Sequence, residues 1–240
     1  MENGGKSFEH EIVVVMPCYN YAHYVREAIS SLKCQTYKDF VCVIVNDGST
    51  DDSEEVIKSE IFGDHRFRYY RIGNQGLSHA RNFGISKVDS KYILSFDPDD
   101  KLSPTYIESA TRFLNRHSDY GLYYGGAEFF FDDGTHIEWE LPQYSYKALL
   151  NGNMIYSACI YRRGLFDKVG GYDEKMDAYE DWDFLIRSLS DGTKVYRTDD
   201  TVFYYRRHDG SMDAKANDKF EDYYRYIQQK NELIFKENNV

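Results

Sequence analysis

Three aspartates within four residues, Asp97, Asp99 and Asp100, follow a short apolar run near the middle of the sequence. The run, 92–96, is typical of a strand buried on both faces of a parallel sheet. Pro98 fixes its own φ angle and favours an extended conformation at Asp97, so the chain would leave the strand in a defined shape. Carboxylates this close repel one another, and Mg²⁺ or Mn²⁺, shared with phosphate oxygens, would relieve the repulsion. An ordinary turn is the alternative, because Asp and Pro are both common turn residues.

The elements that would position these aspartates alternate between strand and helix over the first half of the chain. Apolar runs predict strands over Ile12–Met16, Phe40–Val45 and Phe67–Arg71, with 92–96 as the fourth. Apolar residues at helical spacing predict helices between the strands, for example Leu77–Lys87. Such alternation predicts right-handed βαβ units and a parallel sheet.

Two of the predicted helices begin at recognisable capping residues. Asp51 or Asp52 can cap the helix after the second strand. Ser103 is expected to cap the helix after the fourth strand, with Pro104 at its first position.

Three polar loops follow strands of this predicted sheet: Pro17–Tyr21, Asn46–Asp52 and Asp97–Asp100. Parallel strands present their carboxyl ends at one edge of a sheet, and ligands of open α/β sheets bind there. We therefore expect the three loops to form a single site.

The second half of the chain is less regular. An aromatic-rich strand over Gly121–Phe131 is predicted to turn at Asp132–Gly134 and return as a hairpin. The remaining predicted elements are a short helix over Tyr144–Leu150, a strand over Ser157–Tyr161, a helix over Arg163–Val169 stopped by Gly170-Gly171, a helix at Tyr179–Arg187, one or two strands over Thr193–Arg207 and a charged helical tail over Lys215–Glu237.

Composition narrows the classes of protein further. The chain has 240 residues, 42% of them hydrophobic, which suits one large domain with a sizeable core. Its net charge of −11 argues against a nucleic-acid partner.

No apolar run reaches the roughly 20 residues that span a bilayer, and Met1–His10 lacks the apolar segment of a signal peptide. The four cysteines show no paired spacing, and Cys18 and Cys42 are expected to be buried thiols in a reducing compartment. We expect a cytoplasmic protein without a zinc site.

Five short motifs occur in order along the chain and together carry a resemblance to a known family. They are Met16–Asn20, Val45–Ser53, Asn74–Asn82, Asp97–Asp100 and Glu180–Asp183. Over roughly 11–211 the sequence resembles the family 2 glycosyltransferases, in particular the inverting enzymes of bacterial polysaccharide synthesis. The resemblance implies the GT-A fold: an α/β domain with a mostly parallel central sheet flanked by helices. It also implies a nucleotide-sugar-binding half over 1–115, an acceptor-binding and catalytic half over 116–214, and a helical tail over 215–240.

The resemblance implies a nucleotide-sugar donor, usually a uridine diphosphate (UDP) sugar. Asp47 matches the aspartate that hydrogen-bonds the uracil ring, and Arg81 matches a basic residue near the diphosphate. Each has a structural alternative, a turn residue for Asp47 and a helix-surface arginine for Arg81. The residues implied in donor binding are Pro17, Tyr19, Asp47, Asn74, Gly76, Arg81 and Asp97.

The metal site implied by the resemblance is built on the Asp-x-Asp motif of Asp97 and Asp99. The first carboxylate contacts the ribose or the metal, and the second binds the metal that bridges the diphosphate. A divalent cation, Mn²⁺ or Mg²⁺, lets the nucleoside diphosphate leave as a stabilised anion. His208 matches a position that in some relatives reaches the metal, with a structural histidine as the alternative. Asp100 either supports the site or belongs only to the loop.

Glu180 and Asp181 match the segment that supplies the catalytic base of the family. Inversion requires one carboxylate to deprotonate the acceptor hydroxyl on the face opposite the leaving group. Asp181 is the predicted base, and Glu180 is the second candidate or orients the acceptor. The structural alternative is a pair of acids favoured by a helix N-terminus.

The implied reaction is the transfer of a single sugar, such as a hexose, to a glycan or to a lipid-linked acceptor. Processive members of the family carry membrane helices and a Gln-x-x-Arg-Trp motif, and neither Trp139 nor Trp182 fits that motif. Peripheral association with a membrane stays open.

Two other classes of protein were weighed. A nucleotidyltransferase would carry a Gly-rich, basic loop after the first strand, whereas Pro17–Asn20 contains no Gly, Lys or Arg. A non-catalytic sugar-binding or partner-binding domain of the same fold would not need carboxylates at all three sites.

Overall fold

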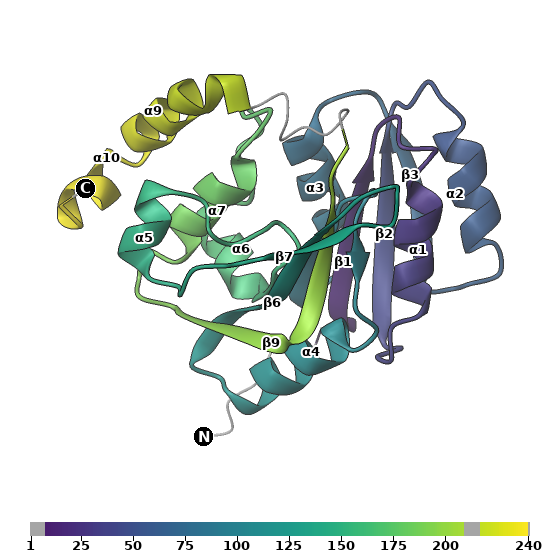
Figure 1. Ribbon diagram of the computed structural model, residues 1–240, viewed down its shortest axis with the longest axis horizontal. Coiled ribbons are helices and arrows are strands. Elements are labelled where there is room, and N and C mark those ends of the chain that lie inside the picture. The colour runs from purple at the N-terminus through teal and green to yellow at the C-terminus, as the bar shows by residue number, and fades with distance from the viewer. Residues whose placement is uncertain (1–7, 209–216, 240) are drawn as a thin grey trace.

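The computed structural model describes residues 8–208 and 217–239 (Figure 1). Residues 1–7 of the N-terminal segment Met1–His10 lie outside this description, as do Lys215, Ala216 and Val240 of the predicted tail. One nine-stranded sheet runs through the molecule in the order β3-β2-β1-β4-β8-β6-β9-β5, with β7 paired to β6.

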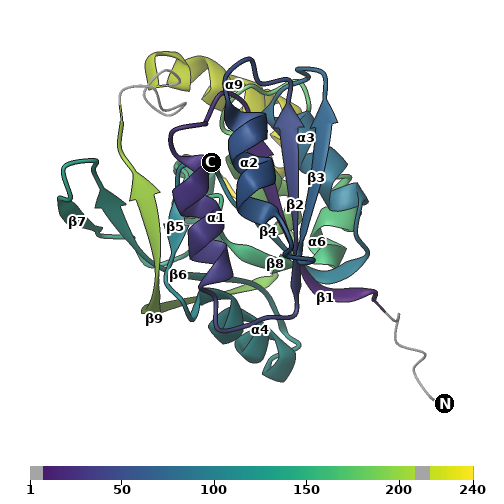
Figure 2. The same cartoon turned by 90° about the vertical axis from the view of Figure 1, so that its right-hand side faces the viewer.

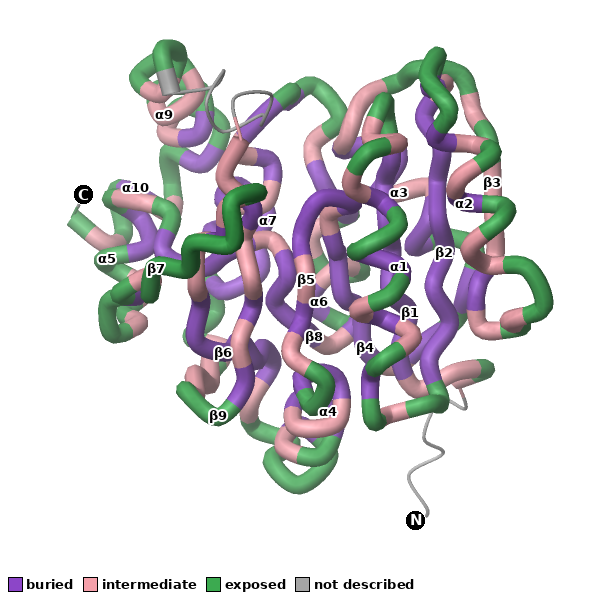
Figure 3. The backbone as a smooth tube through the Cα atoms, turned by 45° about the vertical axis from the view of Figure 1, so that its right-hand side comes forward, coloured by how far each residue is buried: buried purple, intermediate pink, exposed green. Residues whose placement is uncertain are grey.

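The first four strands form the parallel half of this sheet, as the alternating sequence predicted. They are β1 (His10–Cys18), β2 (Phe40–Asp47), β3 (Phe67–Ile72) and β4 (Ser90–Ser95). All three pairings among them are parallel. Figure 3 shows β1, β2 and β4 buried over most of their length, because helices cover both faces of the sheet.

The connecting helices are α1 (Val25–Lys33), α2 (Ser53–Ile61), α3 (Leu77–Ser86) and α4 (Tyr106–Arg116). In Figure 2, α1 and α2 lie on one face of the parallel strands and α3 on the other. Gly84 lets α3 approach closely, since a Cβ there would lie 2.4 Å from a methyl carbon of Val15 on β1. The site-forming loops are therefore held by a tightly packed scaffold.

Beyond β4 the sheet is mixed. Its strands here are β5 (Lys101–Leu102), β6 (Tyr120–Phe130), β7 (His136–Trp139), β8 (Ile160–Arg162) and β9 (Lys194–Arg206). The helices of this half are α5 (Tyr146–Asn151), α6 (Arg163–Val169) and α7 (Glu180–Ser188). β8 pairs antiparallel with both β4 and β6, while β9 lies parallel to β6. The predicted hairpin forms, with β7 returning along β6 after Gly134 adopts a positive φ. The tail contains a 3₁₀ turn (Asn217–Lys219), α9 (Phe220–Lys230) and α10 (Glu232–Glu237).

Several predicted boundaries were wrong, among them the ends of two strands and the start of one helix. Strands β1 and β2 run on through Cys18 and Asp47, because Pro17 and Asn46 still occupy ladder positions, so Asp47 ends a strand instead of lying in a loop. Helix α4 begins at Tyr106 after Thr105, and Ser103 does not cap it. The Ser103 hydroxyl instead accepts a hydrogen bond from the Val202 N–H of β9, a long-range contact that local sequence does not reveal.

Three other sequence features can be compared with the structure: the cysteines, the start of α2 and the lengths of the helices. Cys18 and Cys42 are buried thiols, as expected. Asp51 accepts hydrogen bonds from both the backbone N–H and the hydroxyl of Ser53, the first residue of α2, although it stands one residue before the N-cap position. Within the described ranges, no helix is both long enough and apolar enough to cross a bilayer.

Candidate active site

A cleft of about 1580 Å³ opens at the carboxyl ends of β1, β2 and β4. The loops that follow β1 and β2 are bonded together, since the Asn20 N–H donates to the Ser49 hydroxyl and the Asn20 side-chain oxygen accepts from the Thr50 N–H. The Asp97–Asp100 loop lies in the same cleft. The predicted convergence of three loops is therefore confirmed.

Asp47 fixes the neighbouring loop that begins α3. Its two carboxylate oxygens accept the backbone N–H groups of Gln75 and Gly76, both at 2.8 Å. Gly48 must be a glycine, because its φ is +76° and a Cβ would lie 2.9 Å from the Asn74 nitrogen. Each carboxylate oxygen retains a lone pair, and Asp47, Asn74 and Gly76 all line the cleft.

Pro17 and Tyr19 line the cleft at the end of β1. The Tyr19 side chain is 43% exposed, so a ring face is accessible to a planar ligand. The predicted base-pocket residues are thus brought to the same edge as Asp47.

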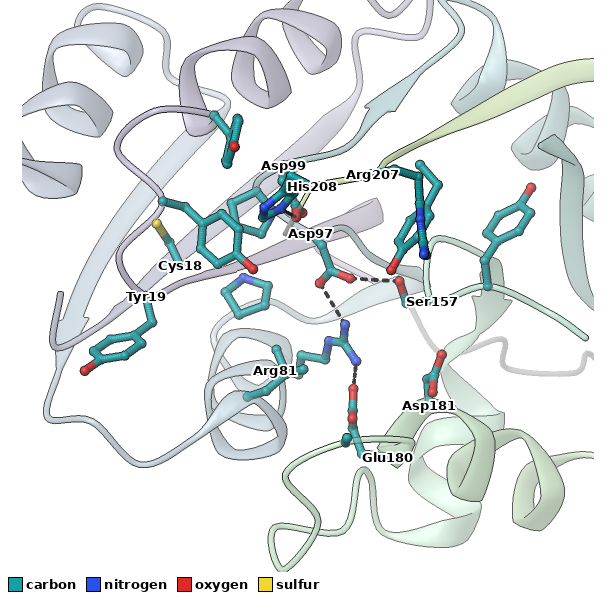
Figure 4. Close-up of a pocket in the computed structure, with 18 of the residues that line it drawn as sticks. Cys18, Tyr19, Arg81, Asp97, Asp99, Ser157, Glu180, Asp181, Arg207 and His208 are labelled. Carbon is teal, nitrogen blue, oxygen red and sulfur yellow. Dashed lines mark hydrogen bonds and ion pairs between the residues drawn. The ribbon is translucent and has the colours of Figure 1, made fainter. Parts of the chain in front are cut away.

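Arg81 is buried, not on the surface of its helix, and joins the two sides of the cleft. One terminal nitrogen lies 2.7 Å from Asp97 Oδ1 and the other is bonded to Glu180 Oε1 (Figure 4). Burial acts to lower the pKa of the Arg81 guanidinium, but the two carboxylates outweigh it and raise that pKa well above its usual value. Because both carboxylates neutralise Arg81, little of its charge is left for a diphosphate.

Glu180 and Asp181 occupy the first turn of α7, whose N-cap Tyr179 has a φ of +58°. Glu180 is 3% exposed, and burial raises its pKa to about 7 against the opposing effect of Arg81. Burial also raises the pKa of Asp181, but that side chain is partly exposed and lines the cleft. One Asp181 oxygen lies 3.3 Å from the side-chain nitrogen of Asn153.

Asp99 and His208 form the second pair of polar groups in the cleft. His208 Nε2 lies 3.1 Å from Asp99 Oδ2, although 109 residues separate them in the sequence. Burial raises the pKa of Asp99, so its ionised form is disfavoured until a positive partner is present.

The predicted metal ligands are brought together only in part. Asp97 is engaged on the other side, by Arg81 and by the Ser157 hydroxyl at 3.0 Å. Within residues 8–208 and 217–239, no three His, Cys, Asp or Glu side chains form a preformed metal cluster. Asp99 and His208 still fit a divalent cation whose other ligands are phosphate oxygens, since carboxylate and imidazole are common ligands of such ions.

Asp100 helps to hold the aspartate loop against β9. It is fully buried, and its Oδ1 accepts the Arg206 N–H at 2.9 Å while the Arg206 side chain donates to the Asp99 carbonyl. Burial raises the pKa of Asp100 well above its usual value. Arg206 therefore ties β9, and His208 two residues further on, to the aspartate loop.

Comparisons with known proteins agree with this geometry. The sequence model described as Glycosyl transferase family 2 matches residues 13–170, and one described as Glycosyltransferase like family 2 matches residues 146–236. The chain belongs to glycosyltransferase family 2.

Relatives within family 2 differ in length. Glycosyltransferase GlyA of Streptococcus pneumoniae is 41% identical over 101 residues, which cover 42% of this chain and 14% of GlyA. An uncharacterized glycosyltransferase of Rickettsia felis is 29% identical over 188 residues, covering 74% of this chain and 31% of the relative. The chain thus spans less than a third of either protein.

Solved structures support the fold. TarS 1–349 of S. aureus in complex with UDP-GlcNAc superposes with a TM-score of 0.73 at 18% identity, covering 86% of this chain and 61% of TarS. The mannosyltransferase PcManGT from Pyrobaculum calidifontis, in complex with GDP-Man and Mn²⁺, gives a TM-score of 0.67 at 14% identity, covering 88% and 63%. The α/β architecture is therefore that of the GT-A enzymes of family 2, as the sequence implied.

The sequence analysis did not identify two residues of the cleft, Ser157 and Asn153, or the buried Arg206 that supports the cleft from behind the aspartate loop. Ser157 supports Asp97, Asn153 contacts Asp181, and Arg206 holds the aspartate loop. No local pattern marks Ser157 or Asn153. Arg206 could have been noticed in the Tyr-Tyr-Arg-Arg-His run before His208, since a basic pair next to a predicted metal ligand invites a carboxylate partner.

Proposed function

We propose that this family 2 member transfers one sugar, with inversion, from a UDP-sugar to a hydroxyl of a glycan or lipid-linked acceptor. The observation that carries the proposal is the Asp97–Arg81–Glu180 bridge, which holds the donor-side aspartate loop against the helix that bears Asp181. In this proposal residues 1–115 bind the donor, 116–214 bind the acceptor and carry the base, and 215–240 form the tail. Within the described part of that tail, Phe220 and Tyr224 pack against Trp182 of α7.

On the donor side, Asp47 would accept the imide N–H of the uracil while Pro17 and Tyr19 flank the ring. Asn74 and Gly76 line the same part of the cleft. We assign Asp97 to the ribose, because its oxygens are already oriented by Arg81 and Ser157. TarS, whose structure contains UDP-GlcNAc, supports uridine, whereas PcManGT contains GDP-Man.

Asp99 and His208 would hold a divalent cation, Mn²⁺ or Mg²⁺. When bound, that cation supplies positive charge to a departing diphosphate. The need for it follows from the cleft itself, which is lined by many carboxylates and would otherwise repel the donor.

Asp181 would act as the general base. It takes the proton of the acceptor hydroxyl, whose oxygen bonds to the anomeric carbon as the bond from that carbon to the diphosphate oxygen breaks on the opposite face. The products are the glycoside of inverted configuration and UDP. Asp181 suits this role better than Glu180, because Glu180 is buried and bonded to Arg81 while Asp181 reaches the cleft.

The test is calorimetric titration with UDP, with and without Mn²⁺, followed by transfer assays. We expect Mn²⁺-dependent binding that Asp99→Ala removes and that the exposed control Asp119→Ala retains. A parallel titration with GDP tests whether the protein prefers the uracil nucleobase to guanine. If neither nucleotide binds in either condition, the proposed function is wrong. Fractionation of the native protein would test the expected cytoplasmic location and any peripheral membrane association.

A further inference from the structure

One wall of the cleft is aromatic. Phe129 on β6, Trp139 on β7 and Tyr205 on β9 line it, and we call these three residues the aromatic wall. The rings of Phe129 and Trp139 stack with centroids 4.8 Å apart and planes at 19°. The ring centroid of Tyr205 lies 5.9 Å from that of Trp139 and 6.0 Å from that of Phe129. All three side chains are partly exposed, so part of the wall is accessible to a ligand.

A second aromatic layer holds this wall in place. Tyr156 stacks on Phe203 at 4.3 Å, and both side chains are buried. The Tyr156 hydroxyl donates to the Gly125 carbonyl and accepts the Gly125 N–H, which fixes the ring. The wall is therefore preorganised, although β7 itself is an exposed edge strand that extends away from the body of the molecule (Figure 2).

The aromatic wall and the predicted base share one cleft. Asp181 and its partner Asn153 line the same cavity as Trp139 and Tyr205. At about 1580 Å³ the cavity exceeds the roughly 300–1,000 Å³ that a single small ligand usually occupies. There is room for a donor at the strand ends and a second molecule against the aromatic wall.

The charge around this second volume is negative. Five carboxylates line the acceptor side: Asp132, Asp133, Asp177, Glu180 and Asp181. Asp132 is paired with Arg206 and Glu180 with Arg81, so the negative charge of this side comes chiefly from Asp133, Asp177 and Asp181. Arg207 also lines the cleft, but its guanidinium lies over the rings of Phe129 and Tyr205, at 5.5 and 5.8 Å. A polyanionic acceptor would be repelled here, whereas neutral hydroxyl groups can donate hydrogen bonds to carboxylates.

We propose that the aromatic wall stacks against a sugar ring of an uncharged oligosaccharide acceptor and presents one of its hydroxyls to Asp181. A saccharide matches both features, because its C–H face packs on flat rings and its hydroxyl edge meets the carboxylates. A lipid chain would match the rings alone. This inference rests on the proposed function and adds the chemical class of the acceptor.

The chain provides its own reporter for this test. Its two tryptophans are Trp139, which is partly exposed in the cleft, and Trp182, which is fully buried and packs against Phe220 and Tyr224 of α9. The full chain, saturated with UDP and Mn²⁺, is titrated with neutral disaccharides of glucose, galactose and N-acetylglucosamine and with their uronic-acid counterparts. Tryptophan fluorescence and calorimetry are recorded together.

We expect at least one neutral disaccharide to change the Trp139 fluorescence, with its uronic-acid counterpart binding about tenfold more weakly or worse. Trp139→Ala should weaken disaccharide binding by about tenfold in calorimetry, while Trp139→Phe keeps most of it. Both variants, and the control Phe62→Ala at a 91% exposed position outside the cleft, should bind UDP as the parent does.

Three results would overturn the inference. One is UDP binding without binding of any neutral disaccharide, and another is preference for the uronic acids. The third is disaccharide binding that Trp139→Ala leaves unchanged. In each case UDP still binds, so the proposed function survives. Failure of UDP itself to bind would instead remove the proposed function and the acceptor with it.

Discussion

The two sides of the cleft are built in different ways. The side that we propose binds the donor consists of loops that leave buried parallel strands. Its contacts include hydrogen bonds between neighbouring loops, as between Asp47 and the N–H groups of Gln75 and Gly76. The side that we propose binds the acceptor consists of aromatic side chains on β6, β7 and β9, and Asp181 of α7 lines the same cleft. The donor side therefore suits a fixed chemical group, while the acceptor side can change with a few exposed side chains.

Arg81 joins the two sides, so its removal should have the largest effect. Arg81→Leu leaves Asp97 and Glu180 as unpaired carboxylates, and loss of one partner from a buried ionic group costs about 3–5 kcal/mol. We expect that loss in urea unfolding, together with loss of transfer activity. Arg81→Lys should recover only part of it, because an ammonium cannot bridge both carboxylates in the same planar geometry.

The matched control is Arg112→Leu, which removes an exposed helix pair with Glu108 and should cost less than about 0.5 kcal/mol. An Arg81→Leu protein as stable as the parent would show that the two sides do not depend on this bridge.

Asp181→Asn should separate the two sides by function. Removing a general base lowers kcat by about 10²–10⁴-fold, while the donor side should bind UDP as before. Transfer kinetics and UDP calorimetry on one preparation measure both quantities, with Asp119→Asn as the exposed control. Full activity of Asp181→Asn with donor bound would place the base elsewhere.

Asp99→Ala should weaken donor binding and leave acceptor binding intact. We expect UDP affinity in Mn²⁺ to fall by at least about tenfold, since the carboxylate that fits the cation is gone. Disaccharide binding on the acceptor side should change little. If UDP affinity and its dependence on Mn²⁺ are both unchanged, Asp99 does not hold the cation.

The structure also predicts a dependence of stability on pH. The pKa of Glu180 rises from 4.5 to about 7 on folding, so the folded chain binds a proton that the unfolded chain has released between these values. The free energy of unfolding should therefore fall as the pH rises from 4.5 through about 7. Burial raises the pKa of Asp181 as well, which adds to the fall.

Urea unfolding at several pH values measures this slope. Glu180→Gln resembles the protonated acid and should flatten this slope. Compared with the parent at the same pH, the variant should be more stable near pH 7 than it is near pH 5. An unchanged slope in this variant would assign the effect to other carboxylates.

Local sequence was sufficient for much of the donor side. The apolar runs predicted β1 to β4 and their parallel pairing, and the polar residues after them marked the loops that meet, because a strand and the loop that follows it are neighbours in the sequence.

The tertiary structure decided what depends on distant residues. It put Arg81 in a buried bridge at the cleft and not on the surface of its helix, and it joined Asp99 to His208 across 109 residues. It also brought Trp139 and Tyr205 into one wall. Periodicity and motifs report the environment of a residue along its own element, whereas its partners on other strands are set by packing and by the register of the sheet.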